Sequence, residues 1–172
     1  MCYFLTLATP LTLSEVRAML PPGLTAQPVG AAQAAAARVL LPGAQTVAEL
    51  LVGGCSCDLV RPRSPDPRED ERELRTRFGR MRLPRGEIIR RLERHRRRGP
   101  GAPAAGPAEL VAFVAEHARN AGPTLYALRF GEDVLPLAAP ASPRTVQQVR
   151  AQPAAWLEED RALLVIRQAP TP

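Results

Sequence analysis

Lysine is absent from this chain of 172 residues, and all 23 of its basic residues are arginines. Together with 19 prolines, 12 glycines and abundant alanine, the absence of lysine is typical of a GC-rich genome. A high arginine count therefore does not by itself indicate that guanidinium groups serve a function. Only the distribution of the arginines along the chain is informative.

Aromatic residues are also scarce, at 4% of the chain, whereas apolar residues make up 45%. We therefore expect a core of alanine, leucine and valine, in a chain whose composition is globular and not disordered. A domain of this length can bury about 70% of the surface of its unfolded chain, so it needs neither disulfides nor metal to form a core. One domain over residues 1–172 is the expected organisation.

Long apolar runs and a disulfide framework are lacking as well. No stretch approaches the roughly 18 apolar residues of a transmembrane helix, and no basic segment precedes the uncharged residues 2–13 as a secretory signal requires. The three cysteines are an odd number and are expected to be reduced thiols. We therefore expect a cytoplasmic protein with no membrane partner.

Local patterns predict an α+β fold in which an antiparallel sheet carries helices on one face. The expected strands and helices follow from apolar periodicity and from start and stop signals. Strands are predicted at residues 3–7 and 162–167, and helices at residues 13–20, 107–120 and 146–152.

Two antiparallel hairpins are also expected. The apolar runs 38–41 and 47–52 are separated by Pro42, Gly43, Ala44 and Gln45, which favour a turn. The runs 124–130 and 134–137 flank a second turn around Gly131.

The middle of the chain differs in charge from the rest. Residues 61–98 contain 15 arginines and seven acidic residues, a net charge of +8, whereas the remainder contains eight arginines and ten acidic residues, a net charge of −2. Segments rich in proline and glycine bound it at 61–67 and 99–107 and are typical of spacers. We therefore expect residues 64–98 to form an appended basic helical hairpin.

Helix signals within this segment are strong. Asp66 is a favourable N-cap, Pro67 suits the first helical position, and Glu69 can complete a capping box. Apolar stripes at residues 74–81 and 88–92 predict two helices that close on a narrow seam.

Arginine in this segment exceeds what nearby acidic residues neutralise. Four acidic residues lie four positions before an arginine, where each pair stabilises a helix by only about 0.2 to 0.5 kcal/mol. Our first hypothesis is a non-catalytic binding or regulatory module whose hairpin contacts nucleic acid or an acidic protein. A solvated helix face without a partner is the alternative. The candidate contact residues are Arg85, Arg90, Arg94, Arg97 and Arg98.

The second hypothesis is a thiol-redox or metal protein centred on Cys55 and Cys57. In extended backbone these two side chains point to the same face, and Cys2 would join them if the first strand pairs nearby. Three thiolates with a histidine or an aspartate would suit tetrahedral zinc, the one cofactor that the sequence suggests. A lone Cys-x-Cys is a weak zinc signal, and buried, inert thiols are the alternative.

Two further residues are expected to have structural roles. His117 lies on the same stripe as Leu110 and Phe113 of the helix at 107–120, which is typical of a helix-edge histidine with a local partner. Trp156 is expected to anchor the core.

Three segments together resemble a family of short bacterial proteins. They are the opening residues 1–6, the stretch from Cys55 to Leu59, and the charged helical residues from Glu73 to Leu92. The resemblance covers roughly the first hundred residues. No activity is known for that family, so the resemblance implies no reaction, and the ligand and the oligomeric state stay open.

Overall fold

The structure is a computed structural model that describes residues 3–52, 56–60, 67–80, 83–97, 105–130, 141–153, 155–159 and 161–166, without the side chains of residues 67–70, 73, 77, 80 and 94–97. The chain divides into two compact units. The first comprises Met1–Pro62 together with Ala104–Pro172, and the second is Arg63–Pro103.

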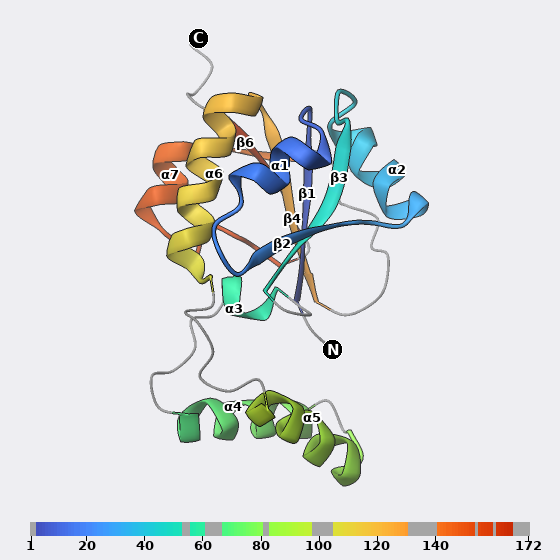
Figure 1. Ribbon diagram of the computed structural model, residues 1–172, viewed down its shortest axis with the longest axis vertical. Helices are drawn as coiled ribbons and strands as arrows, with labels where there is room; N and C mark the ends of the chain where they lie inside the picture. The colour runs from blue at the N-terminus through green and yellow to red at the C-terminus, as the bar shows by residue number, and fades with distance from the viewer. Residues whose placement is uncertain are drawn as a thin grey trace. The chain divides into compact units, whose positions relative to one another are not determined.

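In its described residues, the first unit contains a six-stranded sheet and five helices, whose arrangement Figure 1 shows. The strands are β1 (Tyr3–Thr9), β2 (Leu24–Pro28), β3 (Thr46–Val52), β4 (Thr124–Phe130), β5 (Ser142–Thr145) and β6 (Arg161–Ile166). The helices are α1 (Leu13–Met19), α2 (Ala31–Leu40), α3 (Cys57–Val60), α6 (Pro107–Ala121) and α7 (Val146–Ala151). The second unit contains α4 (Pro67–Arg80) and α5 (Arg85–Arg97).

The sheet is mixed, with strand order β2-β3-β1-β4-β6-β5. Four of its pairings are antiparallel, and Leu5 at its centre lies opposite both Leu50 of β3 and Leu128 of β4. The pairing of β5 with β6 is parallel. The α+β prediction is confirmed, but a purely antiparallel sheet is wrong. The chain passes from β5 through α7 before it enters β6, and such a helical crossover lets neighbouring strands run in the same direction.

Helices pack on both faces of the sheet, so the prediction of helices on one face is also wrong. One cluster joins Leu5 and Leu50 to Val114 of α6, together with residues of α1, α3 and α7. The opposite cluster joins Ala8 and Leu125 to α2. The central strands carry apolar side chains at successive positions and not only at alternate ones, which makes both faces apolar and requires cover on both.

Helix α2 replaces the expected strand at residues 38–41. Its run of alanines favours a helix, and Ala34 and Ala37 are small enough to let the helix approach the sheet closely. The Arg38 guanidinium closes the following turn by donating to the carbonyl oxygens of Ala44 and Gln45. The hairpin of 38–41 with 47–52 is therefore wrong, and β3 pairs instead with β1 and β2.

The strand and helix predictions elsewhere in this unit agree with β1, α1, α6, β4, α7 and β6. Helix α1 begins at a capping box in which the Glu15 amide donates to Thr12 Oγ1 and the Thr12 amide donates to Glu15 Oε2. Donation from the Thr12 hydroxyl, and secondly from the Thr12 amide, to the Glu15 carboxylate lowers the pKa of Glu15. After α1, Gly23 adopts a φ of 86°, which lets the chain turn into β2. The strand expected at 134–137 lies outside the described residues.

Candidate functional sites

The second unit consists of two helices that meet on a narrow apolar seam. Phe78 of α4 is 9% exposed and Leu92 of α5 is 3% exposed, while Ile89 remains 47% exposed. The Arg91 guanidinium lies 5.9 Å from the centre of the Phe78 ring, in cation–π geometry. Among the described side chains of these two helices, Phe78 and Leu92 are the buried apolar ones.

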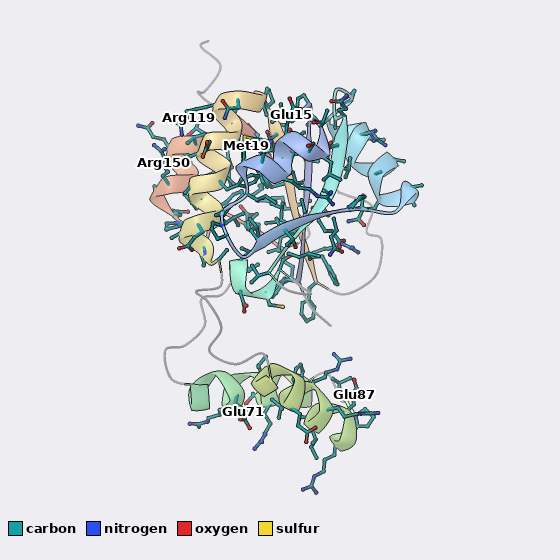
Figure 2. The ribbon with its side chains drawn as sticks, viewed as in Figure 1. Glu15, Met19, Glu71, Glu87, Arg119 and Arg150 are labelled. Carbon is teal, nitrogen blue, oxygen red and sulfur yellow. The ribbon has the colours of Figure 1, made fainter. Side chains whose placement is uncertain are left out.

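Among the described side chains of these helices, ion pairs join residues three or four positions apart in one helix, and Figure 2 labels their acidic partners Glu71 and Glu87. Arg75 Nη2 lies 3.0 Å from Glu71 Oε1 in α4. In α5, Glu87 pairs with Arg91 at 2.8 Å and with Arg90 at 3.0 Å. One carboxylate therefore serves two arginines, and the surplus positive charge on α5 is only partly compensated.

Of the five arginines proposed from the sequence to contact a partner, the structure describes the side chains of two. Arg85 and Arg90 are exposed, and Arg85 forms no ion pair with any described residue. Arg94 and Arg97 belong to α5, but their side chains are outside the description, and Arg98 lies outside the described residues altogether. Asp66, the expected N-cap, also lies outside them.

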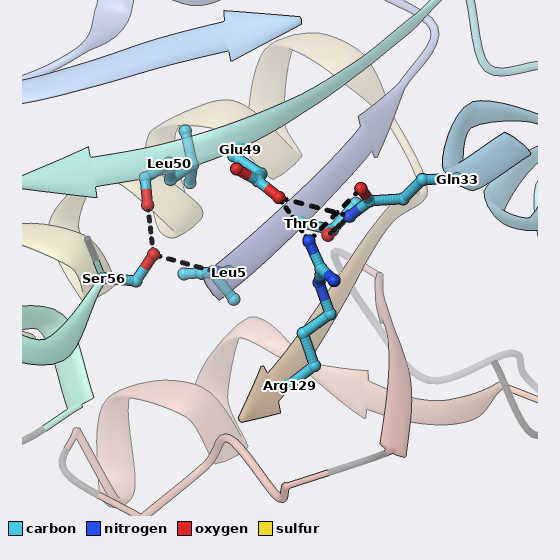
Figure 3. Close-up of polar contacts among 7 residues, drawn as sticks. All are labelled: Leu5, Thr6, Gln33, Glu49, Leu50, Ser56 and Arg129. Carbon is cyan, nitrogen blue, oxygen red and sulfur yellow. Dashed lines mark hydrogen bonds and ion pairs between the residues drawn. The ribbon is translucent and has the colours of Figure 1, made fainter. Parts of the chain in front are cut away.

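At the other candidate site, the segment after β3 returns to the beginning of β1. The Ser56 amide donates to the Tyr3 carbonyl oxygen at 2.9 Å, and the Tyr3 amide donates to Cys57 Sγ at 3.4 Å. Ser56 itself is fully buried. Its hydroxyl accepts from the Leu5 amide at 2.9 Å and donates to the Leu50 carbonyl oxygen at 2.6 Å, which joins β1 to β3 (Figure 3).

These hydrogen bonds involve the sequence neighbours of all three cysteines. Tyr3 follows Cys2, and Ser56 separates Cys55 from Cys57. Cys57 is partly buried, while Cys2 and Cys55 lie outside the described residues. Among the residues that the structure describes, no group of three or more histidine, cysteine, aspartate or glutamate side chains could hold a metal ion. The zinc and redox hypotheses therefore remain predictions.

A third polar arrangement is buried within the first unit. His117 of α6 is fully buried, with Nε2 lying 3.0 Å from Thr9 Oγ1 and Nδ1 lying 3.0 Å from the Tyr126 hydroxyl. The Phe113 ring lies 5.1 Å from the imidazole. His117 is therefore a core residue and not a helix-edge residue as predicted, because α6 packs flat against the sheet and the partners come from β1 and β4.

Burial controls the ionisation of this cluster. Loss of solvation lowers the pKa of His117 to about 4, so its imidazole is neutral at physiological pH. Loss of solvation also raises the pKa of Tyr126 well above its ordinary value. Because both hydroxyl partners can donate and accept, the neutral imidazole is satisfied in either tautomer. The cluster is a neutral, fully buried hydrogen-bond network.

Trp156 lies beside this network, as the core anchor that the sequence predicts. It is 4% exposed, and its ring meets the Tyr126 ring edge-on at 5.4 Å. Its Nε1 is buried without a hydrogen-bond partner among the described residues.

The opposite face of the sheet holds a charged cluster that sequence reasoning missed (Figure 3). Arg129 Nη2 lies 2.7 Å from Glu49 Oε1, and the two side chains are 11% and 18% exposed. Gln33 of α2 donates to Thr6 Oγ1 at 2.7 Å and accepts from Arg129. The Arg129 guanidinium also stacks 5.0 Å from the Phe4 ring. The sequence signal for this cluster is one charged residue within each of two apolar runs, Glu49 in β3 and Arg129 in β4.

Opposite charges meet within this cluster. The guanidinium faces a carboxylate, and the amide of Gln33 bridges them, as buried charges require. The cluster is therefore a structural ion pair that joins β3 to β4 across β1. Gln33 attaches α2 to this pair and so holds the helix on the sheet.

No protein-family model, curated protein or solved structure matches this chain. Among the described helices, none has both the length and the apolar character needed to cross a membrane. The choice among candidate sites therefore depends on the geometry and charge of the chain itself.

Proposed function

We propose that this chain binds nucleic acid through the basic unit formed by α4 and α5. The observation that carries the proposal is the concentration of positive charge in a separate structural unit. Residues 61–98 have 15 arginines against seven acidic residues, a net charge of +8 in a chain whose remainder is −2. A phosphate backbone is the biological polyanion that such a surface binds without any shaped pocket.

The described side chains support this proposal in two ways. Arg72 and Arg85 are exposed and form no ion pair with any described residue. Arg90 is 73% exposed although it pairs with Glu87. A phosphate can therefore replace the Glu87 carboxylate or bind the Arg90 guanidinium together with it. Exposed pairs of this kind contribute only about 0.3 to 0.5 kcal/mol, which is a small barrier to exchange.

Binding is tested by fluorescence anisotropy at low salt with labelled DNA and RNA of mixed sequence. The test variant is the triple substitution Arg90→Gln, Arg94→Gln and Arg97→Gln. We expect binding by the unchanged chain and a loss of affinity of about ten-fold or more in the variant, because phosphate contacts are lost. The slope of log affinity against log salt concentration should also become shallower by about 0.9 for each lost contact.

The matched control removes the same charge from the first unit through Arg119→Gln, Arg150→Gln and Arg161→Gln, all at exposed positions (Figure 2 labels the first two). The control should retain its affinity. Equal losses in both variants would show a general charge effect, and no binding at micromolar protein would refute the proposal.

A second candidate function is a thiol site, favoured by the contacts between the start of β1 and the Ser56–Cys57 turn. The Tyr3 amide donates to Cys57 Sγ at 3.4 Å, and Cys2 precedes Tyr3 in the sequence. Cys2, Cys55 and Cys57 together would supply three thiols for a thiophilic ion such as zinc.

This candidate is tested on protein purified without oxygen, by elemental analysis and by the rate of thiol labelling at neutral pH. A functional site predicts one equivalent of metal, or labelling faster than that of an exposed thiol. The variant with Cys55→Ser and Cys57→Ser should lose both properties. Substoichiometric metal with slow labelling would leave the thiols structural.

A further inference from the structure

We infer that the basic unit prefers double-helical nucleic acid to single strands. This inference rests on the proposed function and names the form of polyanion that the unit binds. It follows from two properties of α4 and α5, namely the lack of an available stacking ring and the arrangement of arginine positions along α5.

Single-strand binding usually depends on aromatic side chains on which unpaired bases stack. Phe78 is the one Phe, Tyr or Trp in the sequence from residue 63 to 103. The structure buries it to 9% exposure in the seam, with the Arg91 guanidinium 5.9 Å from its ring centre. The ring is therefore used to hold the two helices together, and the other planar ring in this stretch is the imidazole of His95.

Arginine positions on α5 form a stripe on the side away from the seam. Residues 90, 94 and 97 are spaced by four and three positions, so they share one helix face. At 100° per residue, that face is about 140° to 160° away from Leu92, which is buried in the seam. A partner that contacts this face of α5 need not displace Leu92 from the seam.

The length of this stripe suits a duplex better than one strand. Seven residues of helix rise about 10 Å, a distance over which a duplex presents about six phosphates and a single strand about three. Arg72, exposed on α4, extends the basic surface beyond α5. A duplex therefore neutralises more arginines per footprint and releases more counterions, which should make its binding both tighter and steeper in salt.

The test compares the full chain binding to a labelled duplex of about 20 base pairs and to each of its separated strands, from about 50 to 200 mM salt. We expect the duplex to bind at least about ten-fold more tightly at equal salt, with a steeper dependence of affinity on salt. Phe78→Leu and His95→Ala should leave both affinities unchanged, provided that circular dichroism shows retained helix.

Three outcomes separate this inference from the proposed function. Equal or tighter binding of the strands overturns the duplex preference and leaves nucleic-acid binding intact, and a loss of strand affinity in His95→Ala or Phe78→Leu would identify the stacking ring. No binding of either form at the lowest salt refutes the proposed function itself. Poly-glutamate bound as tightly as the duplex would assign the surface to acidic polymers in general and overturn both.

Discussion

The two units of this chain are stabilised in different ways. In the first, both faces of a six-stranded sheet are covered, and Leu5, Leu50 and Leu110 are fully buried. In the second, Phe78 and Leu92 are the buried apolar side chains among those described, and Ile89 stays 47% exposed. Burial positions nearly every central residue of the sheet, whereas in α4 and α5 the described charged side chains form ion pairs within one helix or remain exposed.

The largest expected effect comes from truncating one core leucine in each unit. Leu50→Ala removes a fully buried side chain from β3 and should lower the free energy of unfolding of the first unit by about 2 to 5 kcal/mol. Leu92→Ala should reduce helix content while leaving the main thermal transition unchanged. Calorimetry with far-ultraviolet circular dichroism measures both, and a matching drop in the main transition for Leu92→Ala would show that the units unfold together.

Acid should destabilise the first unit through His117. Its pKa is about 4 in the folded chain against 6.5 as the ordinary value, so the unfolded chain takes up the proton first. Stability is therefore fully present above pH 6.5 and decreases as the pH falls towards 4, by a total of about 3 kcal/mol.

Denaturant unfolding between pH 7 and 5 measures this effect before most carboxylates titrate. His117→Gln is less stable at neutral pH but should lose the slope in that window. An unchanged slope in this variant would assign the acid sensitivity to other groups, such as His95 in the second unit.

Removing the charge of Arg129 should have a smaller effect. Arg129→Met leaves Glu49 mostly buried opposite an apolar side chain, which should cost about 1 to 3 kcal/mol after allowance for its partial exposure. Adding Glu49→Gln to this variant should recover part of the loss, because the unpaired carboxylate is then gone. A double-mutant cycle by urea unfolding measures the coupling, and additive losses would show that the pair does not stabilise the fold.

Local sequence signals correctly predict six of the helices and strands in the first unit. Thr12 and Glu15 mark the start of α1, Pro107 and the apolar stripe mark α6, and short runs of mostly apolar residues mark β1 and β4. These signals act between residues a few positions apart, so they can be read without knowing the fold. The charge difference between residues 61–98 and the rest is likewise a property of the sequence alone.

Other features depended on contacts between distant residues. The alanines of α2 are compatible with exposure until a second apolar face of the sheet requires cover. Burial makes His117 a neutral core residue, and Thr9 and Tyr126, 108 and nine positions away, provide its hydrogen-bond partners on two neighbouring strands. The Arg129–Glu49 pair likewise joins residues 80 positions apart. Local sequence signals determined most of the predicted helices and strands, whereas the tertiary structure decided that residues 38–40 are helical, which faces are buried and which polar groups meet, because desolvation and hydrogen bonding depend on three-dimensional proximity.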